Sequence, residues 1–311
     1  MTKRRRTNLA PSVHQLLLNK ARETRRPFNE LLQYYGMERF LYRLSKSSHA
    51  DRFILKGALM FTAWKLASYR PTMDIDLLGK TANQVGGVVG IVKEVCTQSV
   101  EPDGLIFDPA TVVGARIAED ANYKGIRIRF RANLGTARLT LQLDIGFGDV
   151  IVPAPQPAEY PTILDFPAPR LPGYSKESVV AEKFESLVTL GMLNSRMKDY
   201  FDIWSLSRQF DFDGQVLANA IAKTFSNRRT AIVSEPVGLT ARFADDPAKE
   251  AQWRGFLRKS RLDGSPDLGE VLSFVASFLE PVAAALSAGE SFKGEWKAPG
   301  PWIGSSRRKK G

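Results

Sequence analysis

The stretch FILKGALMFTAWKLASYRPTMDIDLLG, residues 53–79, determines the architecture of the first half of this chain. The apolar run at 53–55 predicts a short strand, Gly57 predicts a turn, and residues 58–67 have helical spacing. An Arg-Pro pair ends that helix, because proline disfavours helical geometry in the residue before it. Residues 74–78 (DIDLL) predict a second strand. The stretch therefore predicts a strand–turn–helix–strand unit whose second strand carries two aspartates.

These two aspartates, Asp74 and Asp76, are the sharpest local signal in the sequence. Residues i and i+2 of a strand point to the same face, so their carboxylates lie side by side. Adjacent like charges are costly unless something neutralises them, and Mg²⁺ takes oxygen ligands from one or two carboxylates and from substrate phosphates. Asp144, on the polar face of a later strand, supplies a third carboxylate if the two strands are neighbours. Three carboxylates can hold two metal ions, which suits in-line nucleotidyl displacement. A DxD pair alone is also typical of solvated aspartates at a strand end.

The residues around this pair predict a phosphate-binding segment. Gly57, preceded by Lys56, lets backbone amides approach phosphate oxygens, and the N-terminus of the next helix favours an anion. Arg70 and Thr72, just before the aspartates, supply further donors. Strand, glycine turn, helix and DxD strand is also the order that a nucleotidyltransferase fold requires.

The same stretch resembles the first motif of the AbiEii/AbiGii-type nucleotidyltransferase toxins, relatives of the DNA polymerase beta superfamily. The resemblance continues in LDIGFGD at 143–149 and in YSKESVVAEKFESLVTLGMLNSRMKDYFDIWSL at 174–206, and covers roughly residues 30–210. It implies transfer of a nucleotide from an NTP to an RNA acceptor, in several members the end of a tRNA, which blocks translation. It also implies a partner antitoxin with a DNA-binding domain.

The resemblance implies a role for each matching residue. Asp74 and Asp76 match the metal-binding pair and Asp144 the third carboxylate, so that these residues hold Mg²⁺ or Mn²⁺. Lys183 matches the lysine of the third motif, which contacts the triphosphate or assists proton transfer. Asp199 matches the acid of the fourth motif, with Asp202 left as its alternative.

Elsewhere the chain predicts helices at 9–50 and 83–98, a hairpin at 123–149 and a helical region from Ser175 almost to Leu286. In the hairpin, apolar residues alternate with polar ones on both sides of Asn133-Leu134-Gly135. Residues 153–173 contain seven prolines and are interpreted as a linker or surface crossing. The predicted fold is α+β, a mixed-sheet nucleotidyltransferase-like domain with flanking helices and a helical C-terminal domain. The predicted parts are a helical lead-in at 1–50, the α/β domain at 51–165, the helical domain at 166–300 and a basic tail at 301–311.

Composition excludes several classes of protein. One cysteine, Cys96, excludes a disulfide framework and thiolate metal sites, and two histidines argue against a histidine-rich metal centre. The net charge is +11, of which eight charges lie in basic runs at 3–6 and 307–310, so only +3 belongs to the rest. With no signal peptide and no 18-residue apolar run recognised, we expect a cytoplasmic protein without a membrane span.

Two other functions stay open at this point. The first is a nucleic-acid-binding module that has lost its chemistry, favoured by Ala58-Leu59 after Gly57, where the family commonly has glycine or serine and then a hydroxyl. Its binding surface is a basic stripe and the two tails. The stripe consists of Arg127, Arg129, Arg131 and Arg138. The second is a ribonuclease of the HEPN type, for which Arg43 and His49 have the required spacing.

Overall fold

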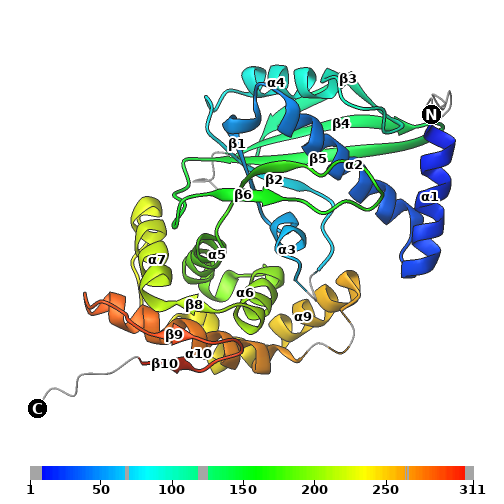
Figure 1. Ribbon diagram of the computed structural model, residues 1–311. Helices are drawn as coiled ribbons and strands as arrows, with labels where there is room; N and C mark the ends of the chain where they lie inside the picture. The colour runs from blue at the N-terminus through cyan, green and yellow to red at the C-terminus, as the bar shows by residue number, and fades with distance from the viewer. Residues whose placement is uncertain (1–8, 67–69, 118–124, 263, 265, 305–311) are drawn as a thin grey trace, which may run out of the picture. The chain divides into compact units, whose positions relative to one another are not determined.

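The computed structural model describes residues 9–66, 70–117, 125–262, 264 and 266–304, and the chain forms two compact units (Figure 1). Unit 1 comprises residues 1–65, 72–148 and 156–173, and unit 2 comprises residues 66–71, 149–155 and 174–311. The helices of the predicted lead-in belong to unit 1, and the chain enters unit 2 at three places instead of crossing a single boundary near residue 165. The basic runs at 3–6 and 307–310 lie outside the described residues.

Unit 1 is built on a seven-stranded mixed sheet with the strand order β3-β4-β5-β2-β1-β7-β6. The strands are β1 (Phe53–Lys56), β2 (Ile75–Gly79), β3 (Leu105–Arg116), β4 (Ile126–Leu134), β5 (Ala137–Phe147), β6 (Gln156–Glu159) and β7 (Arg170–Gly173). β2 runs parallel to β5 and antiparallel to β1, while β4 and β5 form the predicted antiparallel hairpin. The predicted α+β class with a mixed sheet is confirmed.

The strand–turn–helix–strand unit is confirmed with shifted ends. The helix predicted at 58–67 is the short α3 (Leu59–Ala63), because Lys65 takes a left-handed conformation with φ of 58°. β2 begins at Ile75, so Asp74 immediately precedes the strand. α3 is therefore a short connection between the turn at Gly57 and the segment that leads to Arg70.

The linker interpretation of the proline-rich segment 153–173 is wrong. This segment forms β6 and β7, which pair with each other, and β7 continues the sheet beside β1. Proline donates no backbone hydrogen bond, and β6 tolerates Pro157 because it is the edge strand of the sheet. β3, at the other edge, was not predicted, because Pro109 and an irregularity between Asp108 and Val113 interrupt its alternation.

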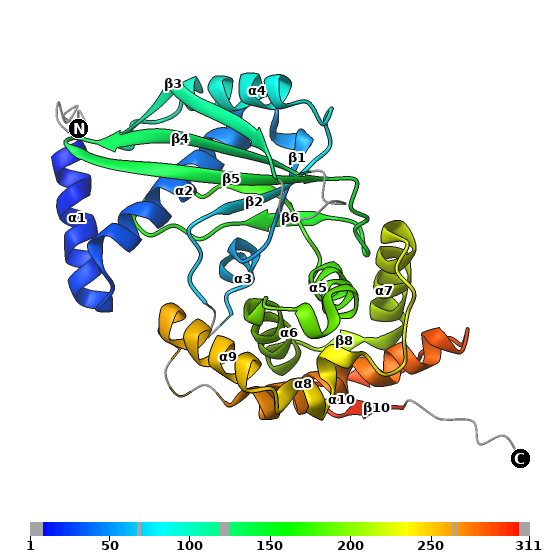
Figure 2. The same cartoon turned by 180° about the vertical axis from the view of Figure 1, so that it is seen from behind.

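One face of the sheet is covered by helices, as Figures 1 and 2 show from opposite sides. α2 (Phe28–Lys46) and α4 (Val85–Thr97) lie on this face, while α1 (Leu9–Thr24) stands at the end of the sheet, beside the β4–β5 turn. The three confirm the predicted helices at 9–50 and 83–98. α2 crosses the sheet and is buried on all sides from Leu31 to Leu44. The ring of Phe40 lies 4.9 Å from that of Phe130 on β4, so the apolar side of the hairpin faces α2.

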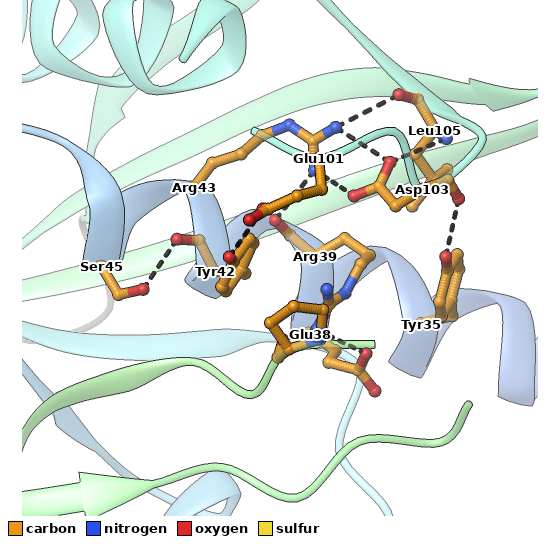
Figure 3. Close-up of polar contacts among 10 residues, drawn as sticks. Tyr35, Glu38, Arg39, Tyr42, Arg43, Ser45, Glu101, Asp103 and Leu105 are labelled. Atoms are coloured by element: carbon orange, nitrogen blue, oxygen red, sulfur yellow. Dashed lines mark hydrogen bonds and ion pairs between the residues drawn. The ribbon is translucent and has the colours of Figure 1, made fainter. Parts of the chain in front are cut away.

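Polar side chains of α2 attach two irregular segments to the helix (Figure 3). Arg43 binds both carboxylate oxygens of Asp103, at 2.6 and 3.0 Å, and Arg39 donates a hydrogen bond to the carbonyl of Pro167 at 2.7 Å. Glu38, which has no exposed surface, accepts a hydrogen bond from the backbone N–H of Ile163 at 2.7 Å. These bonds satisfy polar groups that would otherwise be costly to bury.

Glu38 makes the stability of the protein depend on pH. Burial raises its pKa from 4.5 to about 7, although Arg39 beside it acts in the opposite direction. The folded protein therefore holds this proton between pH 4.5 and about 7 while the unfolded chain releases it, so the free energy of unfolding falls as pH rises through that interval. The loss amounts to about 3 kcal/mol at most. We expect Glu38→Gln to remove this dependence of the unfolding free energy on pH, which denaturant unfolding between pH 4.5 and about 7 measures. If the unfolding free energies of the two proteins fall with pH in parallel, Glu38 is not the cause.

Unit 2 is mainly helical, as predicted from Ser175 onward. Its helices are α5 (Lys176–Leu190), α6 (Met197–Gln209), α7 (Gly214–Arg228), α8 (Ala241–Ala244), α9 (Pro247–Ser260) and α10 (Leu268–Ser287). Three short strands that the sequence did not predict form a small sheet, β8 (Phe212–Asp213), β9 (Glu295–Trp296) and β10 (Trp302–Ile303).

α10 is not an unbroken apolar run, because Glu270 and Glu280 interrupt it, but it contains an 18-residue window with a mean hydropathy of 1.5. By length and composition alone, α10 is long and apolar enough to cross a membrane. Its apolar side chains pack within unit 2, however. Val275, Leu279 and Val282 are fully buried, and the ring of Trp302 stacks on Phe278 at 5.6 Å. The apolar length of α10 thus belongs to the core of unit 2.

Candidate active site

Four charged side chains form a row across four adjacent strands of unit 1. Lys56 on β1 is the register partner of Asp76 on β2, Asp76 is the partner of Asp144 on β5, and Asp144 is the partner of Arg127 on β4. Partners on neighbouring strands, about 4.8 Å apart, point to the same face of the sheet. We call Lys56, Asp76, Asp144 and Arg127 the charge row.

The charge row lies on the sheet face opposite α2. In β4, β5 and β2 the residues flanking the row are buried, among them Ile126, Leu143 and Leu77, and these alternate with the row along each strand. Successive side chains of a strand point to opposite faces. The apolar positions therefore fix both the core and the direction in which the charges point, and all four charged side chains stay half-buried.

Gly57 and Asp76 are in direct contact at the turn that follows β1. Gly57 has φ of +68°, a left-handed conformation that L side chains rarely adopt. A Cβ added there would lie 2.7 Å from both Cβ and Cγ of Asp76 and would overlap its Oδ2. The absence of a side chain at Gly57 thus serves both the turn and the position of the Asp76 carboxylate.

Replacing Gly57 with alanine is therefore expected to displace Asp76. We expect a loss of about 1–2 kcal/mol of unfolding free energy from the left-handed conformation alone, and weaker NTP binding. Gly87→Ala in α4 is a matched control, because nothing lies within 4 Å of an added Cβ there and alanine favours a helix. Denaturant unfolding of both variants checks this, and equal stability changes of the same sign would contradict it.

Asp74 and Thr72 form a short turn before β2. The hydroxyl of Thr72 lies 3.4 Å from the carbonyl oxygen and 3.5 Å from the amide nitrogen of Asp74, and the backbone N–H of Thr72 donates to the hydroxyl of Tyr34 at 2.9 Å. Gln33 donates to the carbonyl of Met73 at 3.3 Å. Side chains of α2 thus hold the segment that carries Asp74 to the beginning of β2.

The expected proximity of Asp144 to Asp76 is confirmed, since β5 is the neighbour of β2. Asp144 also has a partner that was not predicted from the sequence. Arg127 binds both oxygens of its carboxylate at 2.8 Å each. Leu134 pairs with Ala137 at the turn of the hairpin. Moving away from the turn by the same number of residues along each strand brings Arg127 opposite Asp144, so the hairpin register predicts this pair. Of the predicted basic stripe, Arg127 is therefore engaged by Asp144, and Arg129 donates to Gln142 at 2.9 Å.

Asp74, Asp76 and Asp144 would each bind a metal ion through carboxylate oxygens, the ligands that Mg²⁺ prefers. Within the part of the chain that the structure describes, no group of three or more His, Cys, Asp or Glu side chains is arranged to hold a metal ion. Carboxylate oxygens of this kind suit an ion whose coordination shell is completed by substrate phosphates.

The remaining predicted site residues cluster in unit 2. Lys183 on α5 forms ion pairs with Asp199 at 2.6 Å and with Asp202 at 2.8 Å, both on α6. Arg70 binds both oxygens of Asp202 at 2.9 and 3.0 Å. The side chain of Asp202 is only 1% exposed and that of Asp199 7%. Asp202 is thus the more enclosed of the two candidate fourth-motif acids.

The charges of this cluster stabilise one another. Burial disfavours the charged form of Lys183, but Asp199 and Asp202 outweigh it and raise the pKa of the lysine. Burial likewise opposes ionisation of Asp202, but Arg70 and Lys183 hold its pKa below the usual value. The structure thus groups the predicted residues in two sets, Lys56, Gly57, Thr72, Asp74, Asp76 and Asp144 in unit 1, and Arg70, Lys183, Asp199 and Asp202 in unit 2.

The pair expected for a HEPN-type ribonuclease is not available for such chemistry. Arg43 is 7% exposed and is held by Asp103 (Figure 3), while Nε2 of His49 pairs with Glu94 at 2.7 Å. Each side chain therefore has a partner of its own, and Arg43 is buried away from any phosphodiester.

Comparison with known families agrees with the geometry of unit 1. Residues 39–280, more than half of the chain, match the family described as nucleotidyl transferase AbiEii toxin, type IV toxin–antitoxin system. The chain belongs to the AbiEii family. AbiEii membership confirms the predicted enzyme class, a nucleotidyltransferase, and the predicted place in a toxin–antitoxin system. It also implies an NTP substrate and an antitoxin partner.

Three solved structures are similar to this AbiEii-family chain. The nucleotidyltransferase toxin MenT4 from Mycobacterium tuberculosis H37Rv matches with a TM-score of 0.50 and 15% identity, over 91% of this chain and 99% of that one. A putative nucleotidyltransferase from H. pylori matches with a TM-score of 0.44 and 17% identity, over 84% and 98% of the two chains. The protein JHP933 from Helicobacter pylori matches with a TM-score of 0.43 and 18% identity, over 84% and 97%. Comparison with curated protein sequences gave no match.

Proposed function

We propose that this AbiEii-family enzyme moves a nucleoside monophosphate from an NTP to the 3′ hydroxyl of a tRNA in the cytoplasm, and so blocks translation. An antitoxin with a DNA-binding domain restrains it. The observation that carries the proposal is the contact of Asp76 with Gly57. It joins a glycine turn, where backbone amides can approach phosphate oxygens, to a carboxylate suited to a divalent cation.

In this proposal the triphosphate lies over the turn at Gly57, beside Lys56 and Thr72. Asp74 and Asp76 hold Mg²⁺ or Mn²⁺ together with phosphate oxygens, and Asp144 is adjacent to Asp76. A bound divalent cation neutralises charge on the phosphates and on the departing pyrophosphate. The carboxylates keep the ion in place, and Lys56 offsets part of their charge as the register partner of Asp76.

The transfer itself is a single displacement at the α-phosphorus. The acceptor hydroxyl oxygen forms a bond to the α-phosphorus, the bond from this phosphorus to the bridging oxygen breaks, and pyrophosphate leaves with that electron pair. The acceptor proton passes to solvent. For Lys183 and Asp199 we retain the roles that the family resemblance implies, in which Lys183 contacts the triphosphate or assists proton transfer and Asp199 or Asp202 is the fourth-motif acid. Arg70 keeps the role predicted from its position just before the aspartates, a donor to the nucleotide phosphates. The raised pKa of Lys183 supports a permanent positive charge there.

The test uses the full chain, Mg²⁺, total tRNA and each of the NTPs in turn, labelled at the α-phosphate. We expect label on tRNA from one or a few nucleotides. In a parallel sample the tRNA is first oxidised with periodate, which destroys the terminal diol and leaves the rest of the molecule intact. Loss of labelling in that sample supports transfer to the 3′ end. Undiminished labelling of oxidised tRNA would contradict the proposed acceptor, and no label on tRNA from any NTP would contradict the proposed function.

A further inference from the structure

The sheet face that carries the charge row continues along the β4–β5 hairpin toward its turn. Every second residue of a strand points to the same face. Beyond the pair of Arg127 and Asp144, the register pairs on this face are Arg129 with Gln142, Arg131 with Thr140, and Asn133 with Arg138. We call Arg129, Arg131 and Arg138 the arginine patch. From Asp144 to Arg138 this part of the face extends about 20 Å along β5.

The arginine patch is exposed, whereas the residues between its members on β4 are buried. Phe130, for example, packs against Phe40 of α2 on the opposite face, and Figure 2 views the sheet from the side of the patch, with α2 behind the strands. Arg129 donates to the neutral Gln142 at 2.9 Å. The side chains of Arg131 and Arg138 have no hydrogen-bond or ion-pair partner among the residues that the structure describes.

The acidic residues of β3 and β5 on this face leave the positive charge of the patch in place. Asp144 binds Arg127 through both carboxylate oxygens. Asp108 on β3 is the register partner of Arg131, but its Oδ1 accepts a hydrogen bond from the backbone N–H of Ala110 at 3.0 Å. Within the described part of the chain, no carboxylate forms an ion pair with a member of the patch. The patch therefore presents uncompensated positive charge to solvent.

The edge strand β3 adds exposed apolar side chains to the same face. Ile106, the register partner of Asn133, is 71% exposed, and Val113, the partner of Arg129, is 62% exposed. A nucleic acid complements both kinds of group, because its phosphates bind cations and its bases accept apolar contacts. Asn133 and Thr140 between the arginines supply polar groups for hydrogen bonds to ribose hydroxyls.

The position of the charge row favours RNA over an acidic protein as the molecule that binds here. In the proposed reaction the acceptor hydroxyl has to reach the charge row, which lies on the same sheet face as the patch. An RNA that lies along β4 and β5 therefore meets the carboxylates and the arginine patch together. Arginine also binds phosphate oxygens in a bidentate manner, which a row of guanidinium groups repeats along the chain.

We propose that the arginine patch binds the phosphate backbone of the acceptor RNA, and that Ile106 and Val113 contact its bases or riboses. The inference rests on the proposed function and names the surface that holds its acceptor. Contacts with phosphates position a nucleic acid without reading its sequence. The patch therefore binds tRNAs of different sequence alike, and salt weakens this binding because cations are released from the RNA when the arginines bind.

The test measures binding of fluorescently labelled total tRNA to the full chain, without NTP, at several salt concentrations. We expect Arg131→Gln and Arg138→Gln each to weaken binding about three- to tenfold at low salt. The slope of log affinity against log salt concentration should fall by about one for each arginine removed. Ile106→Ser should weaken binding about threefold and leave the slope unchanged, because it removes apolar contact and no charge.

Lys93→Gln is the matched control for the arginine variants. Lys93 is exposed on α4, which packs on the opposite face of the sheet, where Val89 lies next to Ile128 and Gly114. This variant removes one positive charge from unit 1 and should keep the tRNA affinity within about twofold of wild type. Thermal unfolding of each variant verifies that it is folded. If Arg131→Gln and Arg138→Gln bind tRNA as tightly as Lys93→Gln does, the inference is overturned.

A competition experiment separates RNA from an acidic protein partner. Unlabelled tRNA should displace labelled tRNA from the wild type, and polyglutamate at the same concentration of charge should displace it poorly. Equally effective displacement by polyglutamate would overturn the proposal in favour of an acidic protein. Absence of tRNA binding by the wild type would overturn it as well.

The outcomes for the patch and for the proposed function are distinguishable. If tRNA is labelled by an NTP but the patch variants bind tRNA like the control, the proposed function stands and the inference falls. If no NTP labels tRNA but only the patch variants lose tRNA binding, the proposed function falls and the patch is supported as an RNA-binding surface.

Discussion

Asp76→Asn is expected to lower the rate of nucleotidyl transfer by about a thousandfold, the size of effect that follows loss of one preorganised charge-stabilising group. Asp76 is the carboxylate that contacts Gly57, has Asp144 and Lys56 as its register partners, and lies two residues after Asp74. Asparagine keeps the shape of the side chain and removes the charge that a divalent cation needs. The measurement is the single-turnover rate with saturating NTP and Mg²⁺.

The fold of this variant should remain intact. Asp76 is half-buried next to another carboxylate, so loss of its charge relieves repulsion as well as removing an attraction to Lys56. We expect a change of less than about 1 kcal/mol in unfolding free energy. Asp51→Asn, at an exposed position just before β1, serves as the control and should retain full activity. A fully active, folded Asp76→Asn protein would remove Asp76 from the active site.

Lys183→Met is expected to have the largest effect on stability, a loss of about 3 kcal/mol of unfolding free energy. Methionine leaves the carboxylate of Asp199 without its 2.6 Å partner and takes one of the two cations from Asp202, and both aspartates are buried. Removing one partner of a buried pair costs more than the pair itself contributes, because an uncompensated charge remains. Denaturant unfolding at neutral pH measures the effect.

Two further variants test this explanation of the Lys183 effect. Lys198→Met, on α6 next to Asp199, removes the same charge from an exposed position and should change stability by less than about 0.5 kcal/mol. Lys183→Met combined with Asp199→Asn should recover part of the loss, because the unpaired carboxylate is then neutral. If the double variant is less stable than Lys183→Met, the loss does not come from an uncompensated charge.

The parts of the site that local patterns determine could be predicted from the sequence. Alternation of apolar and polar residues placed the β4–β5 hairpin, and the sequence from Phe53 to Gly79 specified a strand, a glycine turn and a second strand bearing Asp76. These patterns depend on neighbours in sequence, since a strand repeats every second residue. The adjacency of Asp76 and Asp144 followed only on the condition that β2 and β5 pair, and they do.

Other features depend on partners far along the chain. Arg70 was expected to face phosphate, and the structure gives it Asp202, 132 residues away, as an ion-pair partner. Strands β6 and β7 were not predicted because their prolines suggested a linker. β6 is the edge strand of the sheet, a position at which proline is tolerated. The apolar character of α10 was not recognised because Glu270 and Glu280 interrupt its apolar residues. Its apolar side chains form the core of unit 2.

Whether this AbiEii-family chain transfers the nucleotide itself is decided by a comparison of two labels. The wild-type protein is incubated with Mg²⁺, total tRNA and one NTP, labelled in one sample at the α-phosphate and in the other at the γ-phosphate. We predict that the α-label enters the RNA, that the γ-label leaves as pyrophosphate, and that Asp76→Asn abolishes both. Label from the γ-phosphate in the RNA would contradict the proposed reaction, because it would show transfer of a phosphoryl group instead of a nucleotide.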